Sequence, residues 1–362
     1  MKKVLIICAG LQFGGVERFA ANTIKFAPAD EFQFDYLIFE GLGDAFAPEI
    51  IEKGGRVITF PSPQQGYKSY IKKLGDLIDN NHYDVVHSHT QFNSGINLWT
   101  AKKHNVPVRI AHSHTTAHEN TMSKKQLAYE KLMRKMILRN ATHCCACGVE
   151  AGKWMYGDKP FTVISNGIDT EMFAYNESYR ISIRKQYGIE NESLLIGHSG
   201  TISKLKNQEL LIRLLPEIRK KRKAELLLLG TCPNQEVIQQ LKNHVSELRL
   251  TDHVHFAGAV MNVNEHLSAF DVFAFPSLRE GTPLALIEAQ ANGLPCIISD
   301  NIAHDAVLTD LVTPISLNGE KAWIEALAGA KRNQPEKYVD IIEKSGYDAR
   351  EAYRMLFEIY RS

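Results

Sequence analysis

The sequence predicts an α/β protein with two Rossmann-like, doubly wound domains that face each other across a cleft. Short apolar runs alternate with amphipathic segments, which is the pattern of parallel sheets covered by helices on both faces. The alternation breaks near residues 170–190 and then restarts. A chain of 362 residues is also long for a single hydrophobic core, which favours two domains.

The expected strands fall into two blocks on either side of that break. The apolar runs of the first block are 3–9, 34–40, 56–60, 84–89, 108–114, 143–148 and 161–166. Those of the second block are 194–200, 224–230, 253–258, 271–277 and 294–300. Amphipathic segments such as 17–27 and 67–80 predict helices between the strands. Since ligands of open parallel sheets bind beyond the carboxyl ends of the strands, the polar residues after these runs are the candidate site residues.

Composition and charge narrow the function classes. A formal net charge of +1 gives no overall attraction to nucleic acid, so no nucleic-acid partner is expected. No apolar run approaches the ~20 residues that span a bilayer, and the N-terminal MKKVLIICAG is expected to form a strand rather than a signal peptide. Three of the six cysteines lie in THCCACG without the paired spacing of structural zinc sites. We interpret them as small strand residues of a reduced, cytoplasmic protein.

The segment 279–300, REGTPLALIEAQANGLPCIISD, predicts a helix that begins at a strand end. Thr282 is a good N-cap and Pro283 suits the first helical position, so the helix is expected to run from Pro283 to Asn292. Gly293 lies just past its end. The unpaired N–H groups and the positive dipole end at the helix start make a ready anion site.

Two carboxylates accompany this helix. Glu280 lies in the loop before it, and Glu288 follows Pro283 by five residues, about 7.5 Å along the helix axis. Carboxylates so separated suit hydroxyl groups on two parts of one long ligand with an anion between them, such as a sugar, a diphosphate and a ribose. The alternative is that Glu280 is a surface loop acid and Glu288 pairs with a structural base.

Two other strand ends carry residues suited to a diphosphate. Lys204 and Lys206 follow Gly200 in SGTISKLKNQ and can act as point charges, although a solvated loop is an alternative explanation. Gly14 and Gly15 precede an expected helix and let the backbone approach a phosphate, unless they form only a tight turn. The first turn lacks the G-x-G-x-x-G pattern, which disfavours a dinucleotide site.

Two His-x-His pairs, His87/His89 and His112/His114, lie at predicted strand ends of the first block. Residues i and i+2 of a strand face the same way, so either pair could bind a metal ion. Because no Asp or Glu at ligand spacing completes a site, we expect no catalytic metal and interpret these histidines as hydrogen-bonding groups of a polar wall.

With these motifs the chain resembles family four of the retaining glycosyltransferases, which have the two-domain GT-B fold. GGVE (14–17) resembles the glycine loop of that family, DVVHSH and RIAHSHT its histidine-bearing strand ends, and VISNGIDTEMF the end of its N-terminal domain. KNQ (206–208) resembles the lysine motif, and FPSLREGTPLALIEAQANGLPCI the signature of two glutamates separated by seven residues. The likeness covers residues 1 to about 310 and is greatest with the subgroup that builds bacterial capsules and exopolysaccharides.

The resemblance implies a hexosyltransferase-type enzyme (EC 2.4) that moves a hexose or N-acetylhexosamine from a nucleotide sugar, expected to be UDP-linked, to a saccharide or lipid-linked acceptor. It implies retention of the anomeric configuration and no metal or other cofactor. Residues 1–175 would form the acceptor domain and 176–345 the donor domain, with a C-terminal helix over about 346–362 returning to the first domain.

The family pattern also implies roles for single residues. Glu288 would hold the nucleotide ribose, Glu280 the hydroxyls of the transferred sugar, and Lys206 the departing diphosphate. His114 would lie beside the sugar, and residues 281–284 would offer backbone amides to the donor. The donor-binding residues are expected to be Gly14, Gly15, Gly200, Thr201, Lys204, Lys206, Gly281, Thr282, Pro283, Leu284 and Glu288, and the catalytic ones His114, Lys206 and Glu280. One departure is Thr201, which stands where many members have Arg, and Lys204 is the candidate to replace that charge.

The acceptor side is expected to include the basic segment 121–140, which carries six basic residues and one acid. Tyr129, Leu132, Met133 and Met136 form an i, i+3, i+4, i+7 stripe within it. A core helix with a solvated basic face explains this pattern. The alternative is a surface that meets a lipid-linked diphosphate acceptor or the anionic inner face of the cell membrane.

Two other functions stay open on the sequence. One is a catalytically degenerate scaffold subunit of a transferase complex, which Thr201 favours and the intact Lys206, Glu280 and Glu288 disfavour. The other is a nucleotide-sugar epimerase on the same architecture, against which the glycine-rich NGID and EGTP segments favour transfer.

Overall fold

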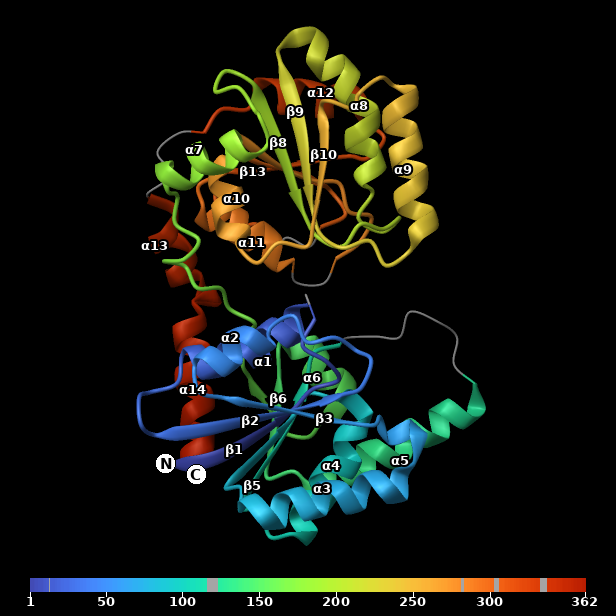
Figure 1. Ribbon diagram of the computed structural model, residues 1–362, viewed down its shortest axis with the longest axis vertical. Helices are drawn as coiled ribbons and strands as arrows, with labels where there is room; N and C mark the ends of the chain where they lie inside the picture. Colours follow the sequence, from blue (N-terminus) through green and yellow to red (C-terminus); the bar gives the residue numbers. More distant parts are fainter. Residues whose placement is uncertain (13, 116–122, 281–282, 303–305, 333–336) are drawn as a thin grey trace. The chain divides into compact units, whose positions relative to one another are not determined.

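The protein is described by a computed structural model that covers residues 1–12, 14–115, 123–280, 283–302, 306–332 and 337–362. The chain folds into two compact units, of which unit 1 comprises residues 1–166 and 349–362 and unit 2 comprises residues 167–348. Each unit is a parallel sheet with helices on both faces (Figure 1). The predicted α/β class with two Rossmann-like domains is therefore confirmed.

Unit 1 contains a seven-stranded sheet in the order β3-β2-β1-β4-β5-β6-β7. Its strands are β1 (Lys2–Ile7), β2 (Phe32–Phe39), β3 (Arg56–Phe60), β4 (Val85–Ser88), β5 (Val108–Ser113), β6 (His143–Ala146) and β7 (Thr162–Val163). Its helices are α1 (Gly15–Lys25), α2 (Ala47–Glu52), α3 (Tyr67–Asn81), α4 (Ser94–Lys103), α5 (Lys124–Asn140), α6 (Val149–Tyr156) and α14 (Ala349–Arg361). The cysteine-rich segment forms β6, where Cys145 is fully buried.

Strand β1 is apolar along its length because helices cover both of its faces. Val4 and Ile6 are buried in the cluster that α1 and α14 complete, whereas Leu5 and Ile7 are buried in the cluster on the opposite face with α3, α4, α5 and α6. The alternation follows from the two-residue period of a strand. It explains why the sequence shows a continuous apolar run here rather than an alternating one.

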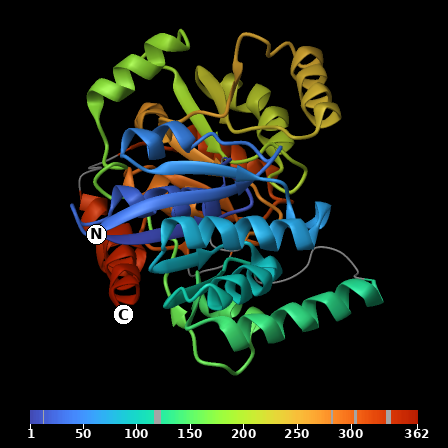
Figure 2. The same cartoon turned by 60° about the horizontal axis from the view of Figure 1, so that its bottom comes forward.

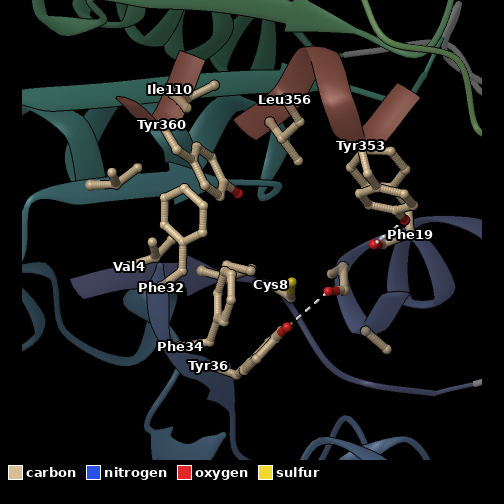
Figure 3. Packing of buried hydrophobic residues seen from close by; sticks show 14 of the residues in the cluster. Val4, Cys8, Phe19, Phe32, Phe34, Tyr36, Ile110, Tyr353, Leu356 and Tyr360 are labelled. Carbon is tan, nitrogen blue, oxygen red and sulfur yellow. Dashed lines mark hydrogen bonds between the residues drawn. The ribbon is translucent and has the colours of Figure 1, made fainter. Parts of the chain in front are cut away.

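The C-terminal helix α14 packs on unit 1, as predicted, although it begins at Ala349 rather than near residue 346. Figure 3 shows Tyr353, Leu356 and Tyr360 directed into the aromatic cluster of this unit. The Tyr353 ring stacks on Phe19 at a centroid distance of 5.1 Å, and its hydroxyl donates to the Phe19 carbonyl at 2.7 Å. Since burying one such side chain contributes about 1.5–3 kcal/mol, α14 is an integral part of this core.

Unit 2 contains a six-stranded sheet in the order β10-β9-β8-β11-β12-β13. Its strands are β8 (Leu194–Ser199), β9 (Ala224–Leu229), β10 (Val254–Gly258), β11 (Val272–Phe275), β12 (Cys296–Ser299) and β13 (Val312–Ile315). Its helices are α7 (Glu177–Gln186), α8 (Gln208–Lys221), α9 (Gln235–Glu247), α10 (Val263–Ala269), α11 (Leu284–Ala291), α12 (Glu320–Gly329) and α13 (Tyr338–Ile342). The sequence pattern missed β13, a short edge strand containing Pro314, a residue that sheets accept at an edge.

The strand order of each sheet reverses once, and these points locate the candidate sites. In unit 1 β1 lies between β2 and β4, and in unit 2 β8 lies between β9 and β11. Loops that leave neighbouring strands at such a point diverge and leave a crevice. The glycine loop follows β1 at the first point, and the two histidine pairs lie at the ends of β4 and of its neighbour β5. The Lys206 and Glu280 loops follow β8 and β11 at the second point.

Helix α5 differs from its prediction in one respect. Its buried stripe is Glu130, Met133, Ile137 and Asn140, with Tyr129 and Met136 partly buried. Leu132 is 55% exposed, so placing it in the packed stripe was wrong. The direction from which α4 packs selects the buried face, and the sequence pattern does not encode that direction. Figure 2 shows α5 on the outside of unit 1.

Within the described residues, every helix is too short or too polar to traverse a bilayer.

Candidate functional site

In unit 2, the loops after β8 and β11 are tied to one another by backbone and side-chain hydrogen bonds. Leu278 donates its N–H to the Leu205 carbonyl at 2.8 Å, and the Asn207 side chain donates to the Pro276 carbonyl at 3.3 Å. These bonds hold two segments side by side that lie some 70 residues apart in the sequence. Lys206 and Glu280 are thereby brought together.

Lys206 and Glu280 form an ion pair, with Nζ and Oε1 2.6 Å apart. Their side chains are only 20% and 11% exposed, so water screens the pair weakly. The Lys206 ammonium also lies 5.3 Å from the centre of the Phe275 ring. The two predicted residues therefore lie side by side, and each neutralises the charge of the other.

Two glycines let the backbone pack closely beside Lys206. Gly230 follows β9 with φ +137°, and a Cβ atom there would lie 2.1 Å from the carbonyl oxygen of Gly200. The Gly200 Cα in turn faces the aliphatic end of Lys206, so that a Cβ would lie 3.7 Å from Cε. Only a glycine at 230 admits this approach.

A buried hydrogen-bond network of His198 and Gln208, close to Lys206, was not predicted from the sequence. His198 Nδ1 lies 2.9 Å from the Ala274 carbonyl and must donate to it, so Nε2 accepts from the Gln208 amide at 3.1 Å. Gln208 also donates to the Thr201 carbonyl at 3.1 Å. Burial lowers the pKa of His198 to about 4, which keeps the ring neutral. The sequence signal was a histidine inside the apolar run LLIGHSG.

Thr201 and Lys204, the residues at the departure from the family pattern, are both exposed. Lys204 lines a cavity of about 280 Å³ together with Gln208 of α8 and with Leu241 and His244 of α9. The lining of that cavity does not include Lys206 or Glu280.

Helix α11 begins one residue later than predicted. Pro283 has non-helical angles (φ −81°, ψ 88°) and occupies the N-cap position, where its carbonyl accepts the N–H of Leu286 at 2.9 Å. The prediction that Pro283 is the first helical residue is therefore wrong, while Gly293 follows the helix at φ +71° as expected. Gly281 and Thr282 lie outside the described residues. Glu288 is half-buried on a helix that buries Leu286, Ile287, Ala289, Gln290 and Ala291.

In unit 1, the glycine loop differs from the expectation of free amides. Gly15 is the first residue of α1, but Gly14 donates its N–H to the Gln12 carbonyl at 3.0 Å. The Glu17 carboxylate folds back so closely that a Cβ on Gly14 would lie 2.2 Å from its Oε2. Burial raises the pKa of Glu17. Glu17 thus occupies the helix start that a phosphate was expected to meet, a contact that sequence reasoning missed.

His114 belongs to a cluster of four histidines from the ends of β4 and β5. Its Nε2 lies 2.9 Å from His89 Nδ1, and its ring stacks on His112 at 4.2 Å. His87 joins the cluster through its Nε2, 3.2 Å from His112 Nδ1. Burial lowers the pKa of His87 and of His114 to about 3 and holds those of His89 and His112 well below the usual value, so all four rings are neutral near pH 7.

Comparison with known protein families assigns both halves of the chain. Residues 13–172 match the family described as Glycosyltransferase Family 4, and residues 180–346 match the family described as Glycosyl transferases group 1. The chain is 33% identical over 373 aligned residues to EpsF of Bacillus subtilis (strain 168), which is named as a glycosyltransferase. The match covers 99% of this chain and 96% of EpsF.

Further relatives agree with this match. A capsular polysaccharide biosynthesis glycosyltransferase of Staphylococcus aureus, CapH, is 25% identical, with 100% of this chain and 99% of CapH covered. An Escherichia coli UDP-Gal:α-D-GlcNAc-diphosphoundecaprenol α-1,3-galactosyltransferase is also 25% identical, covering 91% of this chain and 87% of that enzyme. The crystal structure of Anabaena HepE with UDP-glucose has the same fold, with a TM-score of 0.76, 18% identity and 99% of both chains covered.

Proposed function

This chain belongs to the group 1 and family 4 glycosyltransferases, and on that premise we propose that it transfers a hexose or N-acetylhexosamine from a UDP-sugar with retention of configuration. It has the GT-B fold and is a glycosyltransferase of polysaccharide biosynthesis. The proposed acceptor is a saccharide or a lipid-linked saccharide. The name of the E. coli relative, which includes both a UDP-sugar and a diphosphoundecaprenol acceptor, supports these choices.

The Lys206–Glu280 pair is the observation that carries the proposal. A diphosphate oxygen that approaches Lys206 competes with the Glu280 carboxylate for the same ammonium. Once displaced, Glu280 can accept hydrogen bonds from hydroxyls of the attached sugar. Lys206 then stays in place to stabilise the charge that develops on the leaving diphosphate, and fixed cations of this kind stabilise a transition state without reorganisation. The pair is thus set to change partners when the donor binds.

The other proposed donor contacts follow from the position of α11. The first N–H groups of a helix have no acceptor within it, so Leu284 can donate to the diphosphate. Gly281 and Thr282, which precede it closely in the sequence, are further proposed donor-binding residues. Glu288, four residues after Leu284 on the same helix, is the proposed acceptor for the ribose hydroxyls. Gly14, Gly15 and His114 stay proposed donor residues, and at Gly14 the Gln12 carbonyl and the Glu17 carboxylate have to give way before a phosphate can bind. No metal or other cofactor takes part in the proposed reaction.

The direct test is a panel of nucleotide sugars in a thermal-unfolding assay, followed by product analysis. A bound donor at 100 times its Kd should stabilise the protein by about 2.7 kcal/mol. UDP-hexoses or UDP-N-acetylhexosamines should raise the melting temperature more than GDP-, ADP- or TDP-linked sugars. NMR of the product should show the anomeric configuration of the donor. A chain that no UDP-sugar stabilises would contradict the donor assignment.

Thr201 supports one other candidate, a scaffold subunit without its own activity. A threonine in place of arginine removes a positive charge that many members direct at the diphosphate. The two candidates differ in one assay, since the purified chain alone should release UDP from a donor sugar if it is an enzyme. Release at the rate of the Lys206→Ala variant would favour the scaffold.

We further propose that α5 brings the enzyme to an anionic membrane surface, where a lipid-linked acceptor resides. Leu127, Leu132 and Leu138 on this helix are 52%, 55% and 38% exposed. The basic residues exposed among them are Lys124, Lys125, Lys131, Lys135 and Arg139. A helix with exposed leucines between cations is suited to the interface of anionic lipids. Sedimentation with phosphatidylglycerol vesicles, compared with neutral phosphatidylcholine vesicles, tests this proposal.

A further inference from the structure

The four-histidine cluster of unit 1 has a feature that the transfer reaction does not use. His87 and His112 are side chains of β4 and β5, and His89 and His114 follow two residues later, directly after the last residue of each strand. Since β4 and β5 are parallel neighbours and residues i and i+2 share a face, the four rings meet on one side of the sheet. His87, His89 and His112 are at most 5% exposed.

The spacing of three of these rings matches that of ligands around one ion. His87, His89 and His112 each offer a nitrogen, and the three nitrogens lie within 4.8 Å of one another. His87 Nε2 and His112 Nδ1 are 3.2 Å apart. Two imidazole nitrogens bound at about 2.0–2.1 Å to a tetrahedral ion are separated by about 3.3 Å, so this pair already has the separation of neighbouring ligands.

His89 supplies the clearest sign of a missing partner. Its Nδ1 is engaged with His114, but its Nε2 is buried and has no hydrogen-bond partner within the described part of the chain. Leaving such an atom buried and unsatisfied costs about 1–3 kcal/mol. A metal ion would use this lone pair.

In two of the three rings, those of His87 and His89, the second nitrogen has the kind of neighbour that orients a metal-bound histidine. His87 Nδ1 lies 2.7 Å from the Tyr360 hydroxyl, and His89 Nδ1 lies 2.9 Å from His114 Nε2. His112 Nε2 is buried and, like His89 Nε2, has no hydrogen-bond partner within the described residues. Metal-binding histidines are commonly oriented by such partners on the nitrogen that does not face the ion.

We propose that His87, His89 and His112 bind one borderline transition-metal ion of the Zn²⁺ class in unit 1, with Tyr360 and His114 orienting the ligands. Three neutral imidazoles suit zinc, nickel, cobalt or copper, whereas Mg²⁺ and Ca²⁺ require oxygen ligands. Phe19 packs its ring against His89, His112 and His114 at centroid distances of 5.0–5.8 Å, so the ion would lie in a dry setting. Such an ion joins the ends of β4 and β5 to the C-terminal helix and takes no part in the proposed transfer step.

The test uses the full chain without a histidine tag, stripped with EDTA and then titrated with Zn²⁺ and with Co²⁺. One equivalent of Zn²⁺ should bind, and Co²⁺ should develop the visible absorption of a low-symmetry, four-coordinate site. His89→Gln should abolish both signals. The matched control is His253→Gln, from the separate pair His253/His255 in unit 2. His253 lies 3.3 Å from the Glu225 carboxylate, and this variant should bind Zn²⁺ as the wild type does.

Tyr360→Phe keeps all three ligands and covers the case in which His89→Gln does not fold. Loss of an orienting partner typically lowers metal affinity 10- to 100-fold, so this variant should bind Zn²⁺ at least tenfold more weakly. Less than a tenth of an equivalent bound by the wild type would overturn the proposal, as would unchanged affinity in a folded His89→Gln protein. Because the readout is metal binding, neither result depends on whether the chain transfers sugar.

Discussion

Replacing Glu280 by glutamine removes one negative charge from the Lys206 pair while keeping the size of the side chain. Two unit charges about 4 Å apart attract by about 4 kcal/mol at an effective dielectric of 20, and desolvation offsets much of this. The Lys206 and Glu280 side chains are 20% and 11% exposed, and their charged atoms lie 2.6 Å apart. After desolvation we expect a net attraction of about 1–2 kcal/mol, which a binding diphosphate must overcome. Without that competition, UDP should bind Glu280→Gln about tenfold more tightly, since 1.4 kcal/mol is a factor of ten.

Turnover should change in the opposite direction. Loss of one charge-assisted contact made in the transition state typically lowers kcat by about 10²- to 10³-fold, so a variant that binds UDP better should transfer sugar at least 100-fold more slowly. Isothermal titration with UDP and a UDP-release assay measure the two quantities on the same preparation.

Two matched variants separate the pair from general effects. Lys206→Met should weaken UDP binding, because it removes the cation itself. Glu288→Gln should also weaken UDP binding, because the proposed ribose acceptor loses its charge, and it should lower kcat less than Glu280→Gln does. If Glu280→Gln bound UDP with unchanged or lower affinity, the Lys206–Glu280 pair would not compete with the diphosphate and the reasoning would be refuted.

Three other expectations concern separate parts of the molecule. The pKa of His198 is about 4 in the folded protein, below its ordinary value, so only the unfolded chain takes up a proton at His198 as the pH falls from about 6.5 to 4. The free energy of unfolding should therefore drop by up to about 3 kcal/mol over this range, and this loss should be absent in His198→Gln. Gly230→Ala should lower the free energy of unfolding by about 3 kcal/mol or more, because its Cβ would meet the Gly200 carbonyl at 2.1 Å. The double variant Leu127→Ser/Leu132→Ser should bind anionic vesicles at least tenfold more weakly, since each inserted leucine contributes about 1.5–3 kcal/mol.

Each of these has a control within the chain. Urea unfolding of wild type and His198→Gln at several pH values should show the wild type's advantage shrinking toward pH 4, and a constant difference would contradict the role of burial. Gly188→Ala has φ +66° but nothing within 4 Å of the new Cβ, so it should cost only about 1 kcal/mol, and an equal cost for both glycines would argue against the close approach. Ile181→Ser, which changes a 57% exposed residue of α7, should leave vesicle binding unchanged.

Most strands could be predicted from the sequence because each is covered on both faces and reads as a continuous apolar run. β8, β9, β11 and β12 lie inside their predicted runs for this reason. The errors fall where packing rather than periodicity decides. Leu132 shares a helical stripe with Met133 in the sequence, yet only Met133 of the two is buried. The short edge strand β13 has too little apolar length to be recognised.

The candidate site was predictable as a set of residues but not as an arrangement. Lys206 and Glu280 could be named because each charged residue follows a predicted strand, Lys206 in the segment after Gly200 and Glu280 directly before Gly281. Their contact depends on β8 and β11 being neighbours in the sheet, which no local pattern states. Glu17 over the glycine loop and His198 beneath the lysine were hidden for the same reason, since their partners lie on other loops or strands.

The sequence by itself determined the α/β class, the two blocks of strands and the polar residues at the strand ends, because these follow from the period of apolar residues and from local backbone preferences. Only the tertiary structure decided which of those residues meet. Strand order, the direction of helix packing and the return of α14 to unit 1 join segments that are distant in the chain, and burial at those junctions sets which charges pair and which histidines are neutral.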